Sequence, residues 1–317
     1  MTYHKMLAEE SPRGLPSLEG SEITSELYAK ATRILDELRT YRKVMVAFSG
    51  GVDSTLVAHL AKMALRDKAV AVTADSPSLP VSELREAKEL AQQIGIKHIV
   101  IKTEELEDPN YVANPANRCY FCKKELGGKL LDLAKELGEY TVVDGTNAED
   151  LKGHRPGAAA LVEKGIGRPL AEAGMMKDDV RQLAKSLGLP NHDKPSMPCL
   201  SSRVAYGEII TPERLLRIER AENLIRSLTG VRELRVRDHG NMTRVEVGRN
   251  ERKLFFDEQL LDRISNSLRE LGYVHVTLDM TGYISGSMNE TEANRYGEST
   301  KDQKRSTTRS GHSDTLK

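Results

Sequence analysis

Three cysteines are the first residues of this chain whose type and spacing could carry chemistry. Cys119 and Cys122 form a C-x-x-C pair in NRCYFCKKEL, and Cys199 lies in KPSMPCLSSRVAYG. An odd, partly clustered set of thiols does not suit a disulfide framework, but it suits a metal centre or a redox dithiol. Three thiolates can hold three corners of a [4Fe–4S] cluster, and zinc with an open fourth position is the alternative. Of these two centres, the residues favour the cluster; three unrelated thiols are the plain alternative.

A second group of residues lies in VMVAFSGGVDST. Here Ser49, Gly50 and Gly51 follow an apolar run, and Asp53 and Ser54 begin a predicted helix. A strand that enters a glycine-rich turn and then a helix N-terminus forms an anion site, because backbone N–H groups converge there and the helix dipole adds positive charge. The loop has neither a Walker A motif nor the three glycines of a dinucleotide fingerprint. We therefore predict a phosphate ligand, although an ordinary tight turn also uses paired glycines.

Alternating strands and helices would position both groups. Strand patterns cover residues 43–49, 69–76, 97–103 and 140–147. Helix patterns cover residues 21–41, 53–65, 81–95, 122–138 and 178–188. Short apolar strands that alternate with helices predict an α/β fold with a doubly wound parallel sheet, covered on both faces. In such sheets a nucleotide lies at the carboxyl ends of the strands.

The pattern changes after Cys199 and predicts a second, smaller domain. A helix pattern covers 211–229, two alternating strands flank a His-Gly-Asn turn within 232–248, and a helix (250–271) and a strand (273–280) follow. We predict a flexible arm at 1–20, the sheet domain at 21–200 and an α+β domain for substrate binding and oligomerisation at 201–290. Residues 291–317 have almost no residue able to support a core, so we expect a disordered tail.

Composition limits the partners. Lys plus Arg number 47 and Asp plus Glu number 47, so the formal net charge is zero, which argues against a nucleic-acid partner. No apolar run approaches the roughly 20 residues of a membrane helix, and the N-terminus lacks the pattern of a signal peptide. We expect a cytoplasmic protein with no membrane partner.

The string SGGVDS resembles the PP-loop of the ATP pyrophosphatases, which split ATP between the α and β phosphates. The resemblance implies ATP with Mg²⁺ as ligand, phosphates on the glycine loop and adenine beside the ends of the first two strands. The implied ATP-binding residues are Ala47, Ser49, Gly50, Gly51, Asp53, Ser54, Thr73 and Gly145. For Asp53, contact with Mg²⁺ and capping of the following helix are both open.

Five motifs together are similar to the LarE family of sulfur transferases, over residues 22–290. They are VAFSGGVDST, DGTNAEDLKGHRPG, KPSMPCLSSRVAYG, RVRDHG and LDMTGYISGSMNE. That family thiolates the carboxylates of a pyridinium mononucleotide during assembly of the nickel-pincer cofactor of lactate racemase. The resemblance implies adenylation of pyridinium-3,5-biscarboxylic acid mononucleotide by ATP, followed by replacement of oxygen with sulfur.

Members of this family are of two types. In one, a single cysteine gives up its own sulfur; in the other, three cysteines hold a [4Fe–4S] cluster that carries an additional sulfide. The C-x-x-C pair is typical of the second type, so Cys119, Cys122 and Cys199 are the predicted cluster ligands. Cys199 and Asp53 are the predicted catalytic residues, and sulfide or another sulfur donor is an expected partner. The family also suggests a homo-oligomer.

Arginines suit a substrate that carries phosphate and carboxylates, because a guanidinium binds both bidentately. Arg203 follows Cys199, and Arg235 and Arg237 lie two apart on a predicted strand, where they share one face. These three, with Asp144 at a strand end, are the predicted substrate-binding residues. A solvated strand surface is the alternative for Arg235 and Arg237, and Glu222 is interpreted as a surface residue.

Three other functions stay open at this point. A PP-loop tRNA thiolase would use the same chemistry on a base, but such proteins add zinc knuckles and basic surface, and no cysteine remains for a knuckle. An ATP-dependent amide synthetase related to GMP or NAD synthetases does not explain three cysteines. A regulatory ATP-binding module would release no pyrophosphate.

Overall fold

The computed structural model describes Leu15 and residues 23–152 and 156–284. Contacts divide the chain into two compact units, Met1–Leu216 and Arg217–Lys317, so the division falls later than the predicted boundary at residue 200. Apart from Leu15, which is buried in the core of the first unit, the expected arm lies outside the described residues, as does the expected tail at 291–317. No helix in the described part of the chain is long and apolar enough to cross a membrane.

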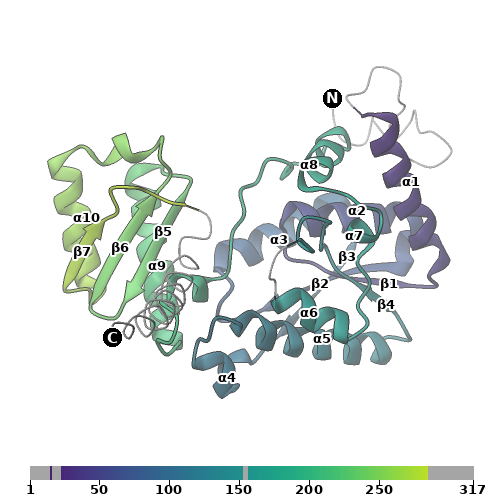
Figure 1. Ribbon diagram of the computed structural model, residues 1–317, viewed down its shortest axis with the longest axis horizontal. Helices are drawn as coiled ribbons and strands as arrows, with labels where there is room; N and C mark the ends of the chain where they lie inside the picture. The colour runs from purple at the N-terminus through teal and green to yellow at the C-terminus, as the bar shows by residue number, and fades with distance from the viewer. Residues whose placement is uncertain (1–14, 16–22, 153–155, 285–317) are drawn as a thin grey trace, which may run out of the picture. The chain divides into compact units, whose positions relative to one another are not determined.

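The first unit is built on a four-stranded parallel sheet in the order β3-β2-β1-β4 (Figure 1). Its strands are β1 (Val44–Ala47), β2 (Ala69–Asp75), β3 (Lys97–Lys102) and β4 (Thr141–Val143). The central strands are runs of Val, Ala and Met that are buried on both faces, as expected for a covered parallel sheet. The predicted α/β fold is therefore confirmed.

Helices cover both faces of this sheet. On one face lie α1 (Ser25–Thr40), α2 (Val52–Leu65), α3 (Val81–Ile94) and α8 (Lys177–Ser186), which share a core with Val44 and Val46. On the other face lie α5 (Arg118–Glu136) and α6 (Pro156–Glu163), which pack on Met45, Val70 and Val72. Alternate residues of one strand thus face opposite layers.

Short helical segments connect these elements. They are η2 (Arg66–Lys68), η3 (Glu105–Glu107), α4 (Pro109–Val112), α7 (Pro169–Glu172) and η4 (Leu200–Arg203). The sequence analysis predicted neither α4, α6 nor α7, because each is too short to show a helical period. It also began the fifth helix at Cys122, whereas α5 begins at Arg118 and includes Cys119.

The strand order fixes where a ligand can bind. From β1 the chain moves outward to β2 and β3, and it returns to the opposite side of β1 with β4. The loops after β1 and β4 therefore leave the sheet edge at a switch point, where open parallel sheets bind their ligands. The predicted phosphate loop and Asp144 follow these two strands.

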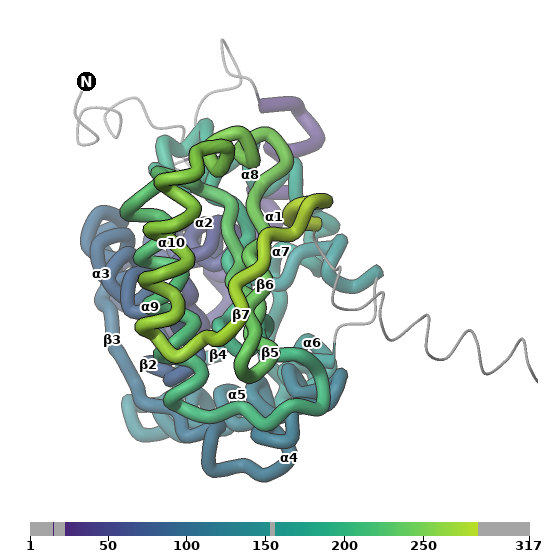
Figure 2. Tube along the Cα trace, turned by 90° about the vertical axis from the view of Figure 1, so that its left-hand side faces the viewer, coloured from purple at the N-terminus to yellow at the C-terminus, as the bar shows by residue number. Residues whose placement is uncertain are grey.

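The second unit contains a small mixed sheet in the order β5-β6-β7. β5 (Leu234–His239) and β6 (Met242–Val247) are antiparallel, and β7 (His275–Leu278) pairs parallel with β6 (Figure 2). Helices α9 (Pro212–Thr229) and α10 (Glu258–Glu270) contribute to one core with the strands. The predicted helix over 250–271 is divided into η5 (Arg252–Phe255) and α10, because Asp257 accepts a hydrogen bond from the Leu260 N–H at 2.8 Å and caps α10.

Candidate active site

The loop after β1 has the geometry of an anion cradle. Gly50 has a φ of +72°, and a β-carbon there would lie 3.2 Å from Ala87, so this position suits glycine alone. Ser54 Oγ accepts from the Ser49 N–H at 3.2 Å and donates to the Gly51 carbonyl at 3.1 Å. Gly51 is the N-cap residue of α2, and no side chain caps the helix. The loop thus presents backbone donors and serine hydroxyls at a helix N-terminus.

Asp53 is held by two side chains from later in the chain. Lys177 Nζ lies 2.5 Å from one carboxylate oxygen, and Asn147 Nδ2 donates to the other at 3.1 Å. Asp53 makes no capping hydrogen bond, so the capping alternative is wrong. Lys177 is the first residue of α8, where the helix dipole disfavours a cation. The ion pair with Asp53 offsets that cost and places a positive charge beside the loop.

The end of β4 closes the other side of the loop. A β-carbon on Gly145 would lie 2.7 Å from the backbone nitrogen of Ser54, so only glycine permits this approach. Asp144 is 5% exposed; its Oδ1 accepts from the Thr146 N–H at 2.8 Å, while its buried Oδ2 has no hydrogen-bond partner. Burial raises the pKa of Asp144 above its usual value, against the opposing effects of Thr146 and nearby cations. A buried carboxylate oxygen without a hydrogen-bond partner beside the cradle is a candidate ligand-binding atom.

The predicted adenine border lies at the ends of β1 and β2. Ala47 ends β1, and Thr73 is buried in β2. The Thr73 hydroxyl donates to the Phe48 carbonyl at 2.7 Å and lies 2.8 Å from His98 Nε2. Burial, with a smaller effect of Lys88, lowers the pKa of His98, which favours the neutral ring. The Thr73 side chain therefore fixes the backbone after β1; contact of Ala47 or Thr73 with adenine stays a prediction.

Cys119 and Cys122 lie in the first turn of α5 at a spacing of three residues, so they share one helix face. Burial raises the pKa of Cys122 to about 12; Glu105, Cys199 and Cys119 raise it further, whereas Lys123 lowers it. Electrostatic effects of Cys119 and Cys199 on Cys122 indicate that the three thiols lie in one region. Within the residues that the structure describes, no group of three or more His, Cys, Asp or Glu side chains is arranged to hold a metal ion.

The segment before Cys199 reaches the phosphate loop. Asn191 Nδ2 donates to the Gly50 carbonyl and to Thr55 Oγ1, at 3.0 Å each. On the far side of Cys199, the Leu200 N–H donates to the Ser78 carbonyl, just after β2, at 2.8 Å. Cys199 is therefore held between hydrogen bonds to the loops that follow β1 and β2.

Arg203 stabilises the Cys199 loop from within. It is fully buried and donates to the carbonyls of Pro198 and Cys199, the latter at 3.0 Å. Ser201 Oγ lies 2.6 Å from the Tyr111 hydroxyl, which ties the loop to α4. The sequence predicted that Arg203 binds substrate; the structure places its guanidinium on its own loop, because those carbonyls need buried donors.

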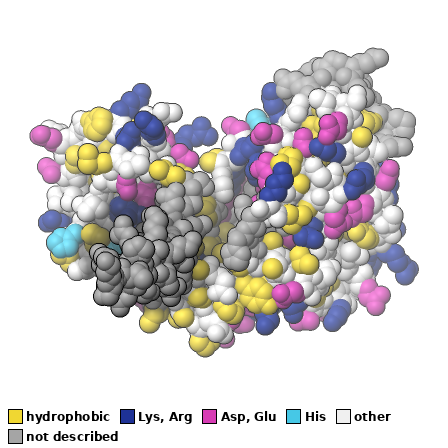
Figure 3. All heavy atoms as spheres, in the orientation of Figure 1, with side chains coloured by type: hydrophobic (Ala, Val, Ile, Leu, Met, Phe, Trp, Pro, Cys, Tyr) yellow, Lys and Arg dark blue, Asp and Glu magenta, His cyan; other side chains and the backbone are white. Residues whose placement is uncertain are grey.

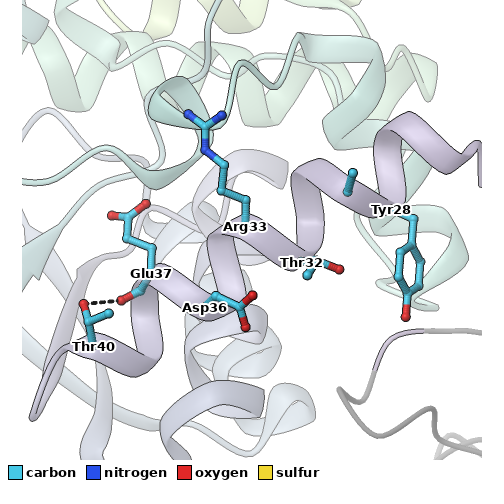
Figure 4. Close-up of a pocket in the computed structure, with 7 residues that line it drawn as sticks. Tyr28, Thr32, Arg33, Asp36, Glu37 and Thr40 are labelled. Atoms are coloured by element: carbon cyan, nitrogen blue, oxygen red, sulfur yellow. Dashed lines mark hydrogen bonds between the residues drawn. The ribbon is translucent and has the colours of Figure 1, made fainter.

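A surface groove of about 760 Å³ runs along α1 (Figure 4). Its lining residues are Tyr28, Ala29, Thr32, Arg33, Asp36, Glu37 and Thr40, none of which was predicted as a site residue. Arg33 donates to the Glu172 carbonyl, and Glu37 accepts from the Tyr41 hydroxyl at 2.8 Å. The charged groups of this groove are thus engaged in local structure, and the groove holds none of the catalytic candidates.

Comparisons with known proteins agree with this geometry. The NAD synthase family model matches residues 27–111, which include the phosphate loop. A pyridinium-3,5-bisthiocarboxylic acid mononucleotide synthase of Lactiplantibacillus plantarum is 37% identical over 84% of this chain and 95% of its own length. The chain belongs to the LarE family. An uncharacterised Synechocystis protein is 48% identical over 78% of this chain and 92% of its own. A glutamine-hydrolysing GMP synthase component of Methanococcus maripaludis is 34% identical over 55% and 60% respectively.

In this LarE-family chain the second unit carries Arg235 and Arg237 in buried positions, 2% and 5% exposed, so the alternative of a solvated strand surface is wrong. The Arg235 guanidinium lies 4.7 Å from the centre of the Tyr283 ring, and Arg237 pairs with Glu246 at 2.8 Å. Glu222 is also buried, and it accepts a hydrogen bond from the Val236 N–H at 3.2 Å, so its interpretation as a surface residue is wrong. Contact of either arginine with substrate stays a prediction.

Two residues of the LarE-family site were missed by sequence reasoning. Lys177 begins a helix next to two aspartates, and a lysine at that end is the one local signal that it serves another purpose. Asn191 lies in a loop and gives no signal, because its partner Gly50 is 141 residues away. The face in Figure 3 shows Lys and Arg interspersed with Asp and Glu, consistent with the zero net charge.

Proposed function

We propose that this protein is an ATP-dependent sulfur transferase that adenylates a carboxylate of pyridinium-3,5-biscarboxylic acid mononucleotide and replaces its oxygen with sulfur. The observation that carries the proposal is the placement of the Cys199 segment. This segment is hydrogen-bonded to Gly50 of the phosphate loop at one end and to Ser78 after β2 at the other. A sulfur-bearing residue thus lies on the loop that contacts the ATP site. The similarity to the mononucleotide synthase supports the same substrate class.

The first chemical step belongs to the phosphate loop. A carboxylate oxygen of the substrate attacks the α phosphorus of ATP, the bond to the β-phosphate oxygen breaks, and pyrophosphate leaves with that electron pair. Ser49, Gly51 and the N-terminus of α2 bind the departing pyrophosphate, and Lys177 adds positive charge beside it. Asp53 is the carboxylate that would hold Mg²⁺, which supplies charge neutralisation when bound.

In the second step a sulfur nucleophile attacks the acyl carbon, and AMP leaves. Cys119, Cys122 and Cys199 would hold the [4Fe–4S] cluster, which would supply a sulfide when bound. The donor set fits, since three thiols in one region suit iron and sulfur. The raised pKa of Cys122 means that its thiol loses a proton on ligation, and Lys123 lowers the cost of that loss.

Several residues and partners complete the proposal. Asp144 contacts the substrate or Mg²⁺ through its Oδ2, while Arg235 and Arg237 bind substrate anions. Arg203 is a positioning residue that holds the backbone of the Cys199 loop. Sulfide is the sulfur donor, and the protein acts as a homo-oligomer in the cytoplasm.

The test begins with protein purified anaerobically. We expect substrate-dependent release of pyrophosphate and AMP, and a product whose mass shows exchange of oxygen for sulfur. Iron and acid-labile sulfide are measured on the same sample, and about four of each per chain are expected. Pyrophosphate release without any change in substrate mass would refute sulfur transfer.

The alternative functions give different results in this assay. Loss of the Cys199 sulfur, detected as a lower protein mass after turnover, would show a sacrificial mechanism without a cluster. Full turnover after replacement of all three cysteines would support an amide synthetase. Binding of tRNA at physiological salt would support a tRNA thiolase.

A further inference from the structure

Asn191 is a buried polar residue to which the chemistry above gives no part. It is 5% exposed, and its Nδ2 group uses both hydrogens, one toward the Gly50 carbonyl and one toward Thr55 Oγ1. Its Oδ1 is buried and has no hydrogen-bond partner. A buried amide oxygen without a hydrogen-bond partner is costly, so the two donor contacts are what keep the residue in this position.

The contact with Gly50 determines how one peptide group of the phosphate loop is oriented. In a trans peptide the carbonyl and the following N–H point in opposite directions. The chain has no cis peptide among the described residues, so the Gly51 N–H points away from Asn191. On that side it donates to Ser49 Oγ at 3.3 Å, which places it in the cradle. Asn191 therefore holds the rear of the peptide whose front faces the phosphates.

This peptide needs an external restraint because glycine supplies none. Gly50 has a φ of +72° and Gly51 has a φ of −74°, and neither has a β-carbon that would oppose rotation of the peptide between them. The Thr55 contact anchors the other hydrogen of the same amide to the first turns of α2, where Thr55 is fully buried. One side chain thus ties the loop to the helix that follows it.

The segment that carries Asn191 is itself fixed. Lys194 pairs with Glu83 at 2.8 Å and with Glu86 at 2.9 Å, both on α3. Arg181 of α8 donates to the Lys194 carbonyl at 2.9 Å. Asn191 is consequently a rigid support and not a mobile loop residue.

We propose that Asn191 is a positioning residue for pyrophosphate binding: its amide fixes the Gly50–Gly51 peptide so that the Gly51 N–H points at the phosphates. The inference rests on the proposed function in one respect, namely that the phosphate loop binds ATP. Asparagine is required because only the amide offers two donors at this size. Aspartate would turn a carboxylate oxygen toward the Gly50 carbonyl and favour the reversed peptide.

The test compares Asn191→Asp and Asn191→Ser with Asp193→Asn, an exposed change two residues away that serves as the matched control. Calorimetric titrations use three probes with Mg²⁺: ATP, inorganic pyrophosphate and adenosine. Both Asn191 variants should bind ATP and pyrophosphate about tenfold more weakly, the loss expected for one oriented hydrogen bond, while adenosine affinity stays within about twofold. The control variant should match the unaltered protein for all three.

The other outcomes overturn the inference. Equal losses for adenosine and pyrophosphate would show a general structural role, and so would failure of both variants to fold by circular dichroism. Unchanged pyrophosphate affinity in a folded variant would show that the loop orients itself. If the unaltered protein binds neither ATP nor pyrophosphate, the proposed function fails first and the inference fails with it.

Discussion

The close approach of Gly145 to α2 gives the sharpest prediction for this protein. In Gly145→Ala the new β-carbon would lie 2.7 Å from Ser54 N and 2.9 Å from Ser54 Cα, whereas ordinary contact begins at 3.4 Å. A displacement of about 0.7 Å must therefore be taken up by backbone, since no flexible side-chain end is involved. The φ of Gly145 lies outside the left-handed range, so the effect is steric and not conformational.

The displaced backbone is the one that binds phosphate. Overpacking of this kind costs about 1–3 kcal/mol of stability. A shift of this size at a reacting centre lowers kcat/KM by about tenfold to a hundredfold. The assay is pyrophosphate release at several ATP concentrations, together with thermal unfolding of the same sample.

Gly128→Ala is the matched control for this prediction. Gly128 lies within α5, and a β-carbon there meets nothing within 4 Å. We expect unchanged kinetics and a gain of about 1 kcal/mol, because alanine is the better helix former. Unchanged kinetics and stability in Gly145→Ala would refute the claim that the β4 loop supports the phosphate cradle.

Three further predictions follow from the site and the core. Lys177→Met removes the cation beside Asp53 and should raise the KM for ATP about tenfold, whereas the exposed Lys152→Met should not; equal effects in kinetic assays would contradict the role of Lys177. Alanine at any one of Cys119, Cys122 or Cys199 should abolish iron binding measured by elemental analysis, and retention of iron in any single variant would argue against one shared centre. Burial lowers the pKa of His59 from 6.5 to about 4, so the unfolded chain takes up a proton first as the pH falls. Stability should consequently drop by up to about 3 kcal/mol between those two pH values, and denaturant unfolding of His59→Gln should show a flatter profile.

Much of the first unit was predictable because the signals are local. The apolar runs that became β1, β2 and β4 carry their burial in their own residues, and the paired glycines mark the loop after β1. Longer helices were found from their period, as in α3, which ends at Gly95 with a φ of +72° as the predicted helix does. Short helices such as α4 have four residues, which is too few for a period to appear.

The functional roles of charged residues were harder to predict because charge alone does not reveal a partner. Arg203 was expected to bind substrate, yet its own loop supplies the carbonyls that it binds. Arg237 was expected to be either a ligand or a surface residue, and it lies buried against Glu246, nine residues away on the next strand. Strand register decides that pairing, and register depends on the turn and on both strands together.

The sequence by itself determined the type of sheet, the phosphate loop and the set of thiols. These depend on residue type and short spacing, which act through backbone sterics and hydrogen bonding within a few residues. Only the tertiary structure decided which distant groups meet at the loop. Lys177 reaches Asp53 over 124 residues and Asn191 reaches Gly50 over 141. Such contacts form only when burial of the apolar faces has already brought α2, α8 and the Cys199 segment together, because no local preference of these side chains selects one partner over another.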